Sequence, residues 1–249
     1  MIKAFVLATA LALASAGAAT AQDAVRGNLG ASDPDEWGPI LPPSPSFGGQ
    51  EAYERGDYAE AVRLWRIAAD QGDASAQFSL GSSYGNGSGV PQSDAEAVRW
   101  YRMAADQDEA AAQNNLGLMY QQGQGVPKND AEAVRWYRMA AVQGVASAQY
   151  NLGQMYRQGQ GIPQNYAEAI RWYRLAADQG LADAQTNLGF MYGTGQGVPQ
   201  NYVEAYKWYA LSAAQGDTTA VSNRDLVLDQ MTPAQIAEGQ RLAAAWQPR

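Results

Sequence analysis

Three recurring sets of residues in this 249-residue chain could carry chemistry. Regularly spaced glutamates could act as the paired carboxylates of a glycoside hydrolase. Trp-Tyr pairs could stack against sugar rings, and glycine-rich loops such as residues 193–197 could cradle phosphates. The glutamates are Glu60, Glu96, Glu132, Glu168 and Glu204, and the aromatic pairs begin at Trp100, Trp136, Trp172 and Trp208.

The spacing of these residues argues against each of the three chemistries. The glutamates recur every 36 residues, three positions after a helix-capping residue, which is a structural position. The glycine loops follow helical patterns and lack a Lys-Ser/Thr ending. The fixed period of the aromatic pairs on amphipathic helices predicts packing, with sugar stacking as the alternative. We therefore predict no catalytic, cofactor-binding or metal-binding residues.

Composition narrows the function classes further. The chain contains neither Cys nor His, which excludes disulfides, thiol nucleophiles, catalytic triads with His and nearly every zinc ligand set. Lys plus Arg number 17 against 25 Asp plus Glu, a formal net charge of -8. This balance disfavours nucleic acid or an anionic membrane surface as the main partner.

The first 49 residues consist of two segments that differ in composition. Lys3 precedes an apolar, alanine-rich stretch, and Ala19-Thr20-Ala21 fits the small-x-small cleavage rule, so residues 1–21 are predicted to be a signal peptide cleaved after Ala21. The stretch is too short and too rich in alanine for a good membrane anchor. We therefore expect a periplasmic or secreted product without a membrane span. Residues 22–49 are rich in Pro and Gly and predict a flexible leader, with a docking motif around Trp37 as the alternative.

Internal repetition dominates the rest of the chain. Residues 94–107 and 130–143 are identical at 13 of 14 positions. A period of 36 residues predicts a solenoid with one supersecondary unit in each repeat. The same offset relates Leu80, Leu116, Leu152 and Leu188, and also Tyr84, Tyr120, Tyr156 and Tyr192.

Each repeat carries two helical patterns. In one copy, an amphipathic helix begins after the capping residue Asn165, with Glu168 three positions later, and ends near Gly180, where the left-handed conformation is accessible. Asp108 replaces this terminal glycine in another repeat, which predicts a strained or differently capped turn. The last part of the chain departs from the repeat, and Thr232-Pro233 predicts the start of a final capping helix.

The other helix of the same copy is expected over residues 146–158. Gly153 lies in its middle, at a cost of about 1 kcal/mol relative to alanine. The same glycine recurs in the other copies, which predicts a close approach of the partner helix at this point. The recurring positions are Gly81, Gly117, Gly153 and Gly189.

The combined pattern AxxxLGxMYxxGxGVPxN and YxEAxxWYxxAAxQG resembles the Sel-1-like repeat (SLR) family, which is related to tetratricopeptide repeats. The resemblance implies an all-α fold, in which antiparallel helix hairpins of 36 residues stack into a curved, right-handed superhelical solenoid. On this basis the solenoid spans residues 50–247. Its parts are an incomplete leading pair at 50–72, repeats at 74–109, 110–145, 146–181 and 182–217, and C-terminal capping helices at 218–247.

Candidate binding residues are those that differ between copies without serving the scaffold, together with a recurring asparagine. By resemblance to tetratricopeptide repeats, they lie on the helix that lines the concave surface. The asparagines could hold the backbone of an extended peptide, or they could bridge helices within the scaffold. The predicted partner-binding residues are Phe78, Asn115, Leu118, Tyr150, Asn151, Gln154, Arg157, Asn187 and Phe190.

The sequence thus predicts a non-catalytic adaptor of the bacterial cell envelope that binds a protein or peptide on its concave surface. A module that binds peptidoglycan or another glycan is the alternative. A β-lactam-interacting enzyme, as described for some cysteine-rich members of the family, is a weaker one, because the chain has no Cys and no Ser-x-x-Lys sequence. The sequence leaves the identity of the partner and the oligomeric state open.

Overall fold

The computed structural model describes residues 44–248, and these residues form twelve helices and no strand. The first helices are α2 (Pro45–Glu54), α3 (Tyr58–Asp70), α4 (Ala74–Asn86), α5 (Asp94–Ala105), α6 (Ala110–Gln122) and α7 (Asp130–Val142). The remaining helices are α8 (Ala146–Gln158), α9 (Tyr166–Asp178), α10 (Ala182–Thr194), α11 (Tyr202–Ala214), α12 (Thr218–Leu228) and α13 (Pro233–Ala244).

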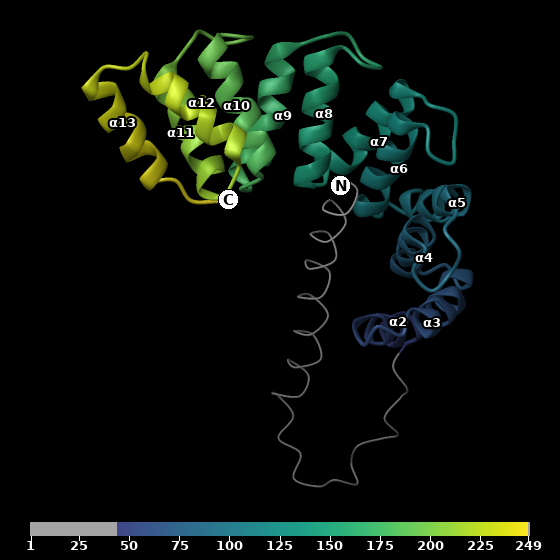
Figure 1. Ribbon diagram of the computed structural model, residues 1–249. Helices are drawn as coiled ribbons and strands as arrows, with labels where there is room; N and C mark the ends of the chain where they lie inside the picture. Colours follow the sequence, from purple (N-terminus) through teal and green to yellow (C-terminus); the bar gives the residue numbers. More distant parts are fainter. Residues whose placement is uncertain (1–43, 249) are drawn as a thin grey trace, which may run out of the picture. The chain divides into compact units, whose positions relative to one another are not determined.

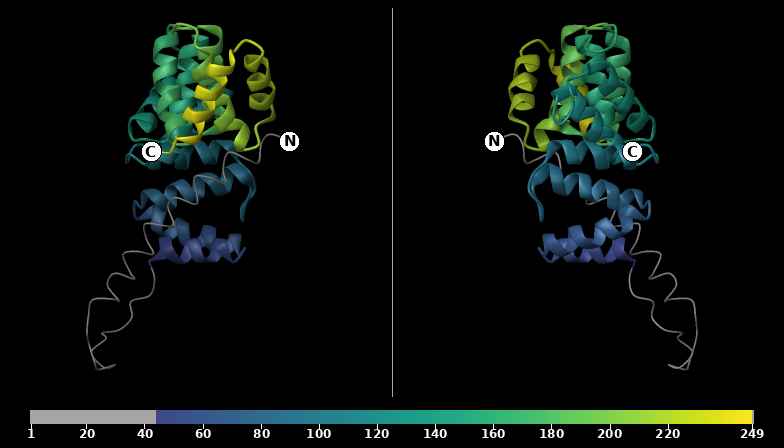
Figure 2. Two further views of the ribbon diagram at one scale, coloured as in Figure 1. Left: turned by 90° about the vertical axis from the view of Figure 1, so that its left-hand side faces the viewer. Right: turned by 90° about the vertical axis from the view of Figure 1, so that its right-hand side faces the viewer.

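The helices are packed in chain order. From α2 to α12, consecutive helices pack against one another, which produces the succession of hairpins seen in Figures 1 and 2. The predicted all-α solenoid is confirmed. The exception lies at the C-terminal end, where α13 packs against α11.

The first described helix begins earlier than the sequence indicated. Helix α2 starts at Pro45, inside the segment 22–49 that was expected to be a flexible leader. Proline is well tolerated in the first turn of a helix, and Gly49 lets α2 approach α3 so closely that a Cβ there would lie 2.5 Å from Cδ1 of Trp65. Burial against Trp65 therefore makes this Pro/Gly-containing stretch helical. The predicted signal peptide and the rest of the leader lie outside the described residues.

Polar caps begin the second helix of each hairpin, as predicted. The side chain of Asn165 accepts a hydrogen bond from the backbone N–H of Glu168, and Ser93, Asn129, Asn201 and Asp57 act in the same way. The Glu168 carboxylate pairs with Arg171 one turn later instead of reaching back to the cap. The repeated glutamates are therefore accounted for by capping positions and exposed ion pairs of low energetic value.

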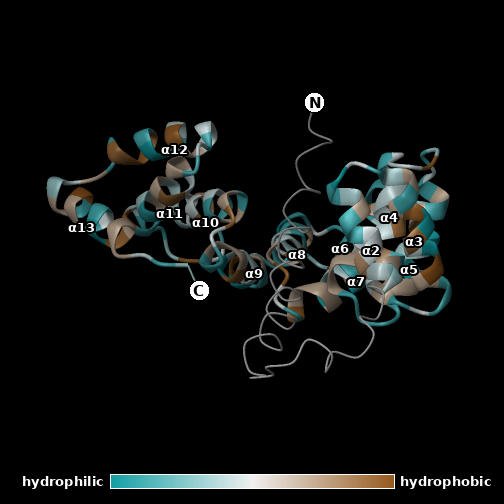
Figure 3. Ribbon diagram, turned by 90° about the horizontal axis from the view of Figure 1, so that it is seen from below, coloured by the Kyte–Doolittle hydropathy of each residue, from teal (hydrophilic) through white to brown (hydrophobic). Residues whose placement is uncertain are grey.

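Apolar and polar residues alternate around individual helices, as Figure 3 shows for α12 and α13. The repeat tryptophans are buried by this arrangement, and each is shared between two hairpins. Trp136 on α7 is 4% exposed and packs into the cluster that contains Tyr101 of α5 and Leu116 of α6. Trp100, Trp172 and Trp208 join their preceding hairpins in the same way. The packing interpretation of the Trp-Tyr pairs is therefore confirmed.

Buried glutamines form a second connection between repeats that the sequence analysis missed. Gln149 donates to the carbonyl of Ala141 at 3.2 Å and accepts from Gln179 Nε2 at 2.9 Å. The same two bonds recur at Gln77, Gln113 and Gln185. Each buried amide thereby satisfies a helix-end carbonyl and accepts a bond from a glutamine at the end of the following second helix.

Left-handed residues end the second helices. Gly144 and Gly180 have φ of 92° and 90°, and Asp108 adopts a φ of 64° at the equivalent place. Asp108 is the one non-glycine residue with positive φ among residues 44–248. The strained turn that the sequence predicted here is confirmed.

We expect Asp108→Gly to raise the free energy of unfolding by about 1 kcal/mol, because glycine adopts the left-handed conformation without a steric penalty. Removing the Asp108 side chain costs little stability, because the hydrogen bond that its Oδ1 accepts from Gln113 is long, at 3.4 Å. Urea denaturation followed by circular dichroism measures the change. Asp108→Ala is the control, because it removes the side-chain bond without relieving the backbone. An equal gain in both variants would contradict the prediction.

Candidate binding surface

The nine predicted binding residues all lie on the first helices of the hairpins. We call the solvent-facing sides of α4, α6, α8 and α10 the first-helix surface. Phe78 lies on α4, Asn115 and Leu118 on α6, four residues on α8, and Asn187 and Phe190 on α10. Every one of them is half-buried. The structure therefore spreads the candidates over four successive repeats.

Two of the aromatic candidates also support the scaffold. The ring of Phe78 lies 5.8 Å from that of Tyr101, and the ring of Tyr150 lies 5.8 Å from that of Tyr173. Both pairs have the same interplanar angle of 41°. These two residues hold the first and second helices of a hairpin together.

Helix α8 carries four candidates, and three of them are in contact. Gln154 Nε2 donates to the Tyr150 hydroxyl at 2.6 Å, and Arg157 Nη2 donates to Gln154 Oε1 at 3.3 Å. Asn151 lies on the same helix and donates to Asn114 Oδ1 on α6 at 3.2 Å. Tyr150, Gln154 and Arg157 thus form one connected cluster on α8, and Asn151 connects instead to α6.

The recurring asparagines do not form a uniform ladder. Asn151 bridges two repeats through Asn114, whereas Asn187 Nδ2 donates to the Asp183 carbonyl of its own helix at 2.8 Å. Asn115 Oδ1 accepts a long bond of 3.4 Å from Asn114. At Asn151 the geometry favours the scaffold interpretation, because the amide joins α6 to α8.

We expect Asn151→Ala to lower the free energy of unfolding by about 1 kcal/mol, since the acceptor Asn114 is buried and loses a donor. Asn187→Ala is the matched control. Its amide donates to a carbonyl of its own helix and lies beside the half-buried Tyr150 hydroxyl, so the change should cost less, about 0.5 kcal/mol. Thermal and urea unfolding of the two variants compare them directly. Equal destabilisation would show that the cross-repeat bond adds nothing.

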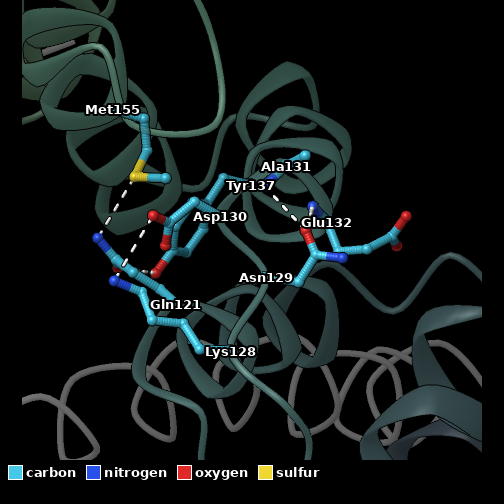
Figure 4. A network of polar contacts seen from close by, with 8 residues as sticks. All are labelled: Gln121, Lys128, Asn129, Asp130, Ala131, Glu132, Tyr137 and Met155. Atoms are coloured by element: carbon cyan, nitrogen blue, oxygen red, sulfur yellow. Dashed lines mark hydrogen bonds and ion pairs between the residues drawn. The ribbon is translucent and has the colours of Figure 1, made fainter.

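Tyrosine hydroxyls from the second helices also reach this surface, which the sequence analysis missed. Tyr101 donates to Ser82 at 3.1 Å, and Tyr137 donates to Gln121 Oε1 at 2.7 Å. Figure 4 shows the Gln121 amide between the Tyr137 hydroxyl and the sulfur of Met155, to which Gln121 Nε2 donates at 3.3 Å. Their period identified these tyrosines as core residues. No sequence signal indicated that the hydroxyl would meet a residue that varies between copies.

Charges on the first-helix surface are sparse. Arg157 is the one cation in the sequences of α2, α4, α6, α8 and α10. Among the ion pairs of residues 44–248, none includes Arg157. Burial raises the pKa of the Tyr150 hydroxyl, and the nearby Asp183 carboxylate raises it further. Tyr150 therefore stays neutral at physiological pH and can both donate and accept a hydrogen bond.

The structure also bears on sugar stacking, metal binding and membrane insertion. The four repeat tryptophans are 2–7% exposed, so their faces are covered by protein. Within the part of the chain that the structure describes, no group of three or more His, Cys, Asp or Glu side chains is placed to hold a metal ion. In that same part, no helix is both long enough and apolar enough to cross a membrane.

The repeat pattern is that of a known family. Residues 46–73, 74–109, 110–145, 146–181 and 182–217 each match the Sel1 repeat. This chain belongs to the Sel1 repeat family. Its first Sel1 match begins at residue 46, four residues before the solenoid start expected at 50, in agreement with the early start of α2.

Solved structures of Sel1 proteins have the same fold. A Sel1 repeat protein from Oxalobacter formigenes is 33% identical, with a TM-score of 0.67, over 79% of this chain and 84% of that one. A protective antigen present in uropathogenic Escherichia coli strains, which displays an SLR fold, is 29% identical with a TM-score of 0.52. That match covers 79% of this chain and 51% of the antigen. No curated protein has significant sequence similarity to this chain.

Sel1 repeat arrays generally serve as scaffolds for protein interaction, which is the class of function that the sequence predicted. The fold accounts for this use, since each hairpin contacts its chain neighbours and leaves one side of every first helix accessible.

Proposed function

We propose that this Sel1 protein is a non-catalytic adaptor of the bacterial cell envelope that binds a protein or peptide on its first-helix surface. The observation that carries the proposal is the contrast between conserved scaffold positions and differing surface positions within one chain. Leu80, Leu116, Leu152 and Leu188 are identical and fully buried. Two residues further along the same helices, the half-buried positions are Ser82, Leu118, Gln154 and Phe190.

The order of apolar and polar side chains along these helices suits an extended partner. Leu118 on α6 and Phe190 on α10 are apolar, and between them α8 presents the polar cluster around Gln154. A peptide that crosses three hairpins would meet an apolar, then a polar, then an apolar contact. Half-buried aromatic and aliphatic anchors with polar groups between them are typical of peptide-binding grooves.

The envelope location rests on residues 1–21, which have the charge, apolar stretch and small-x-small ending of an export signal. Mass spectrometry of the protein purified from its native host tests this directly. We expect a mature N-terminus at Gln22 and recovery in the extracytoplasmic fraction. An intact N-terminus on a cytoplasmic protein would contradict the location.

Site-specific photo-crosslinking tests the binding surface. A photoreactive amino acid at Leu118, in the full chain expressed in its native host, should give one dominant adduct that mass spectrometry can identify. The matched control carries the same group at Arg171, which is exposed on the second helix α9. Adducts of equal intensity from both positions, or no adduct from Leu118, would contradict the proposed surface.

A further inference from the structure

Among residues 44–248, the buried Tyr173 hydroxyl at the first-helix surface lacks a hydrogen-bond acceptor. Tyr101 and Tyr137 donate to Ser82 and Gln121, respectively. Tyr173 is the equivalent residue one repeat further on, and it is fully buried. Its hydroxyl donates to no acceptor within the described residues. Buried hydroxyls are normally satisfied, so the missing partner needs an explanation.

A second buried donor without an acceptor lies beside this hydroxyl. Arg157 follows Gln121 by one 36-residue repeat, so it occupies the position from which Gln121 meets Tyr137. The Nε of Arg157 is buried and also has no partner among residues 44–248. Burial raises the pKa of Tyr173, and the charge of Arg157 and a hydrogen bond from its guanidinium to the hydroxyl oxygen oppose that rise, as expected for adjacent groups. The site therefore contains a guanidinium N–H and a phenol O–H without an acceptor.

The charge of Arg157 identifies the kind of acceptor that is missing. The arginines of the second helices all have an acceptor. Arg135 and Arg171 pair with glutamates one turn earlier, and Arg138 donates to the Tyr156 hydroxyl. Among the described residues Arg157 pairs with no carboxylate, and its Nη2 donates to the Gln154 amide oxygen at 3.3 Å. An uncompensated guanidinium beside a hydroxyl donor matches the two oxygens of a carboxylate.

We infer that Arg157 and Tyr173 together bind a carboxylate of the partner, either an Asp or Glu side chain or a free C-terminus. This inference rests on the proposed peptide-binding function and names the chemistry of that ligand. Both donors are covered in the free protein, so the Arg157 side chain moves outward to admit the ligand. This movement breaks no ion pair. Gln154 and Tyr150, which follow on α8, offer further polar contacts beside the carboxylate.

Matched synthetic peptides test the inference. The probes are arrays of immobilised, acetylated random hexapeptides, each made with a C-terminal carboxylate and with a C-terminal amide. A second series replaces Asp and Glu by Asn and Gln. We expect labelled full-length protein to bind the carboxylate forms at least about tenfold more tightly than their neutral counterparts. The two series distinguish a C-terminal carboxylate from an acidic side chain.

Three variants connect this binding to the site. Arg157→Gln should lose the preference for carboxylates, whereas Arg171→Gln, which removes the same charge from the second-helix side, should retain it. Tyr173→Phe keeps the ring and removes only the orphaned hydroxyl. It should weaken carboxylate binding several-fold while leaving the thermal unfolding midpoint unchanged or higher. A purely structural role of the hydroxyl would lower that midpoint instead.

Two outcomes would overturn the inference. If peptides bind equally well with and without carboxylates, and Arg157→Gln has no effect, the carboxylate site is wrong and the proposed adaptor function stands. If no peptide binds, the carboxylate site is again wrong. The crosslink from Leu118 then decides the adaptor function separately, because it requires no carboxylate.

Discussion

Replacing Trp136 with alanine is expected to lower the free energy of unfolding by about 3–5 kcal/mol, the range for truncation of a buried tryptophan. Trp136 is 4% exposed and packs among residues of α5 and α6, although it belongs to α7. The substitution therefore leaves a cavity at the junction between two hairpins. Because a solenoid is stabilised by its nearest-neighbour interfaces, we also expect the two halves to unfold in separate steps.

Urea denaturation followed by circular dichroism and by native-state hydrogen exchange measures both effects. Trp136→Phe is the matched control. The indole Nε1 of Trp136 makes no hydrogen bond in the described structure, so phenylalanine loses only part of the ring volume and should cost less than half as much as alanine. A single cooperative transition with an unchanged midpoint in Trp136→Ala would contradict this account of the interface.

Gly153→Leu is expected to destabilise the protein by about 1–3 kcal/mol through overpacking. A Cβ at Gly153 would lie 2.8 Å from Cδ1 and Cε1 of Tyr173 and 3.3 Å from the Ala169 carbonyl oxygen. Even the first atom of a side chain therefore requires α8 and α9 to move apart. Tyr173 is fully buried and its ring cannot turn away without disturbing its neighbours.

Two glycine-to-alanine variants separate this effect from helix propensity. Both Gly153→Ala and Gly85→Ala gain helix propensity, by about 1 kcal/mol in the middle of α8 and less near the end of α4. A Cβ at Gly85 would meet only Ala97 Cβ, at 3.8 Å. We expect Gly85→Ala to raise the thermal unfolding midpoint and Gly153→Ala to lower it. Changes of the same sign in both variants would show that the crossing at Gly153 is not tightly packed.

The sequence predicted the fold in detail because the repeat copies act as an internal comparison. The apolar and glycine positions that return every 36 residues, such as Leu152 and Gly153, are buried, and a Cβ at Gly153 would lie 2.8 Å from the Tyr173 ring. The helix over residues 146–158, the cap at Asn165 and the turn at Asp108 follow from short-range rules, and all three agree with the structure. Local signals of this kind do not depend on distant contacts.

The start of the array could not be predicted in this way. Pro45 and the glycines that follow it disfavour a helix by local propensity, and α2 forms because Gly49 packs on Trp65 of the next helix. Tertiary burial outweighs a propensity penalty of about 1 kcal/mol for each glycine. The other repeats did not indicate where the array starts, because the first Sel1 match is shorter than the four that follow.

One part of the candidate site could be predicted from the sequence, and the other part is known only from the structure. Sequence comparison between copies identified Arg157 as a residue outside the scaffold pattern. The structure alone placed it beside Tyr173 and left the donors of both residues without acceptors. The sequence by itself determined the repeat, its helices and its caps, because these depend on residues a few positions apart. Which hydroxyls and amides meet across neighbouring hairpins was decided only by tertiary packing, because a hydrogen bond depends on distances that periodicity does not specify.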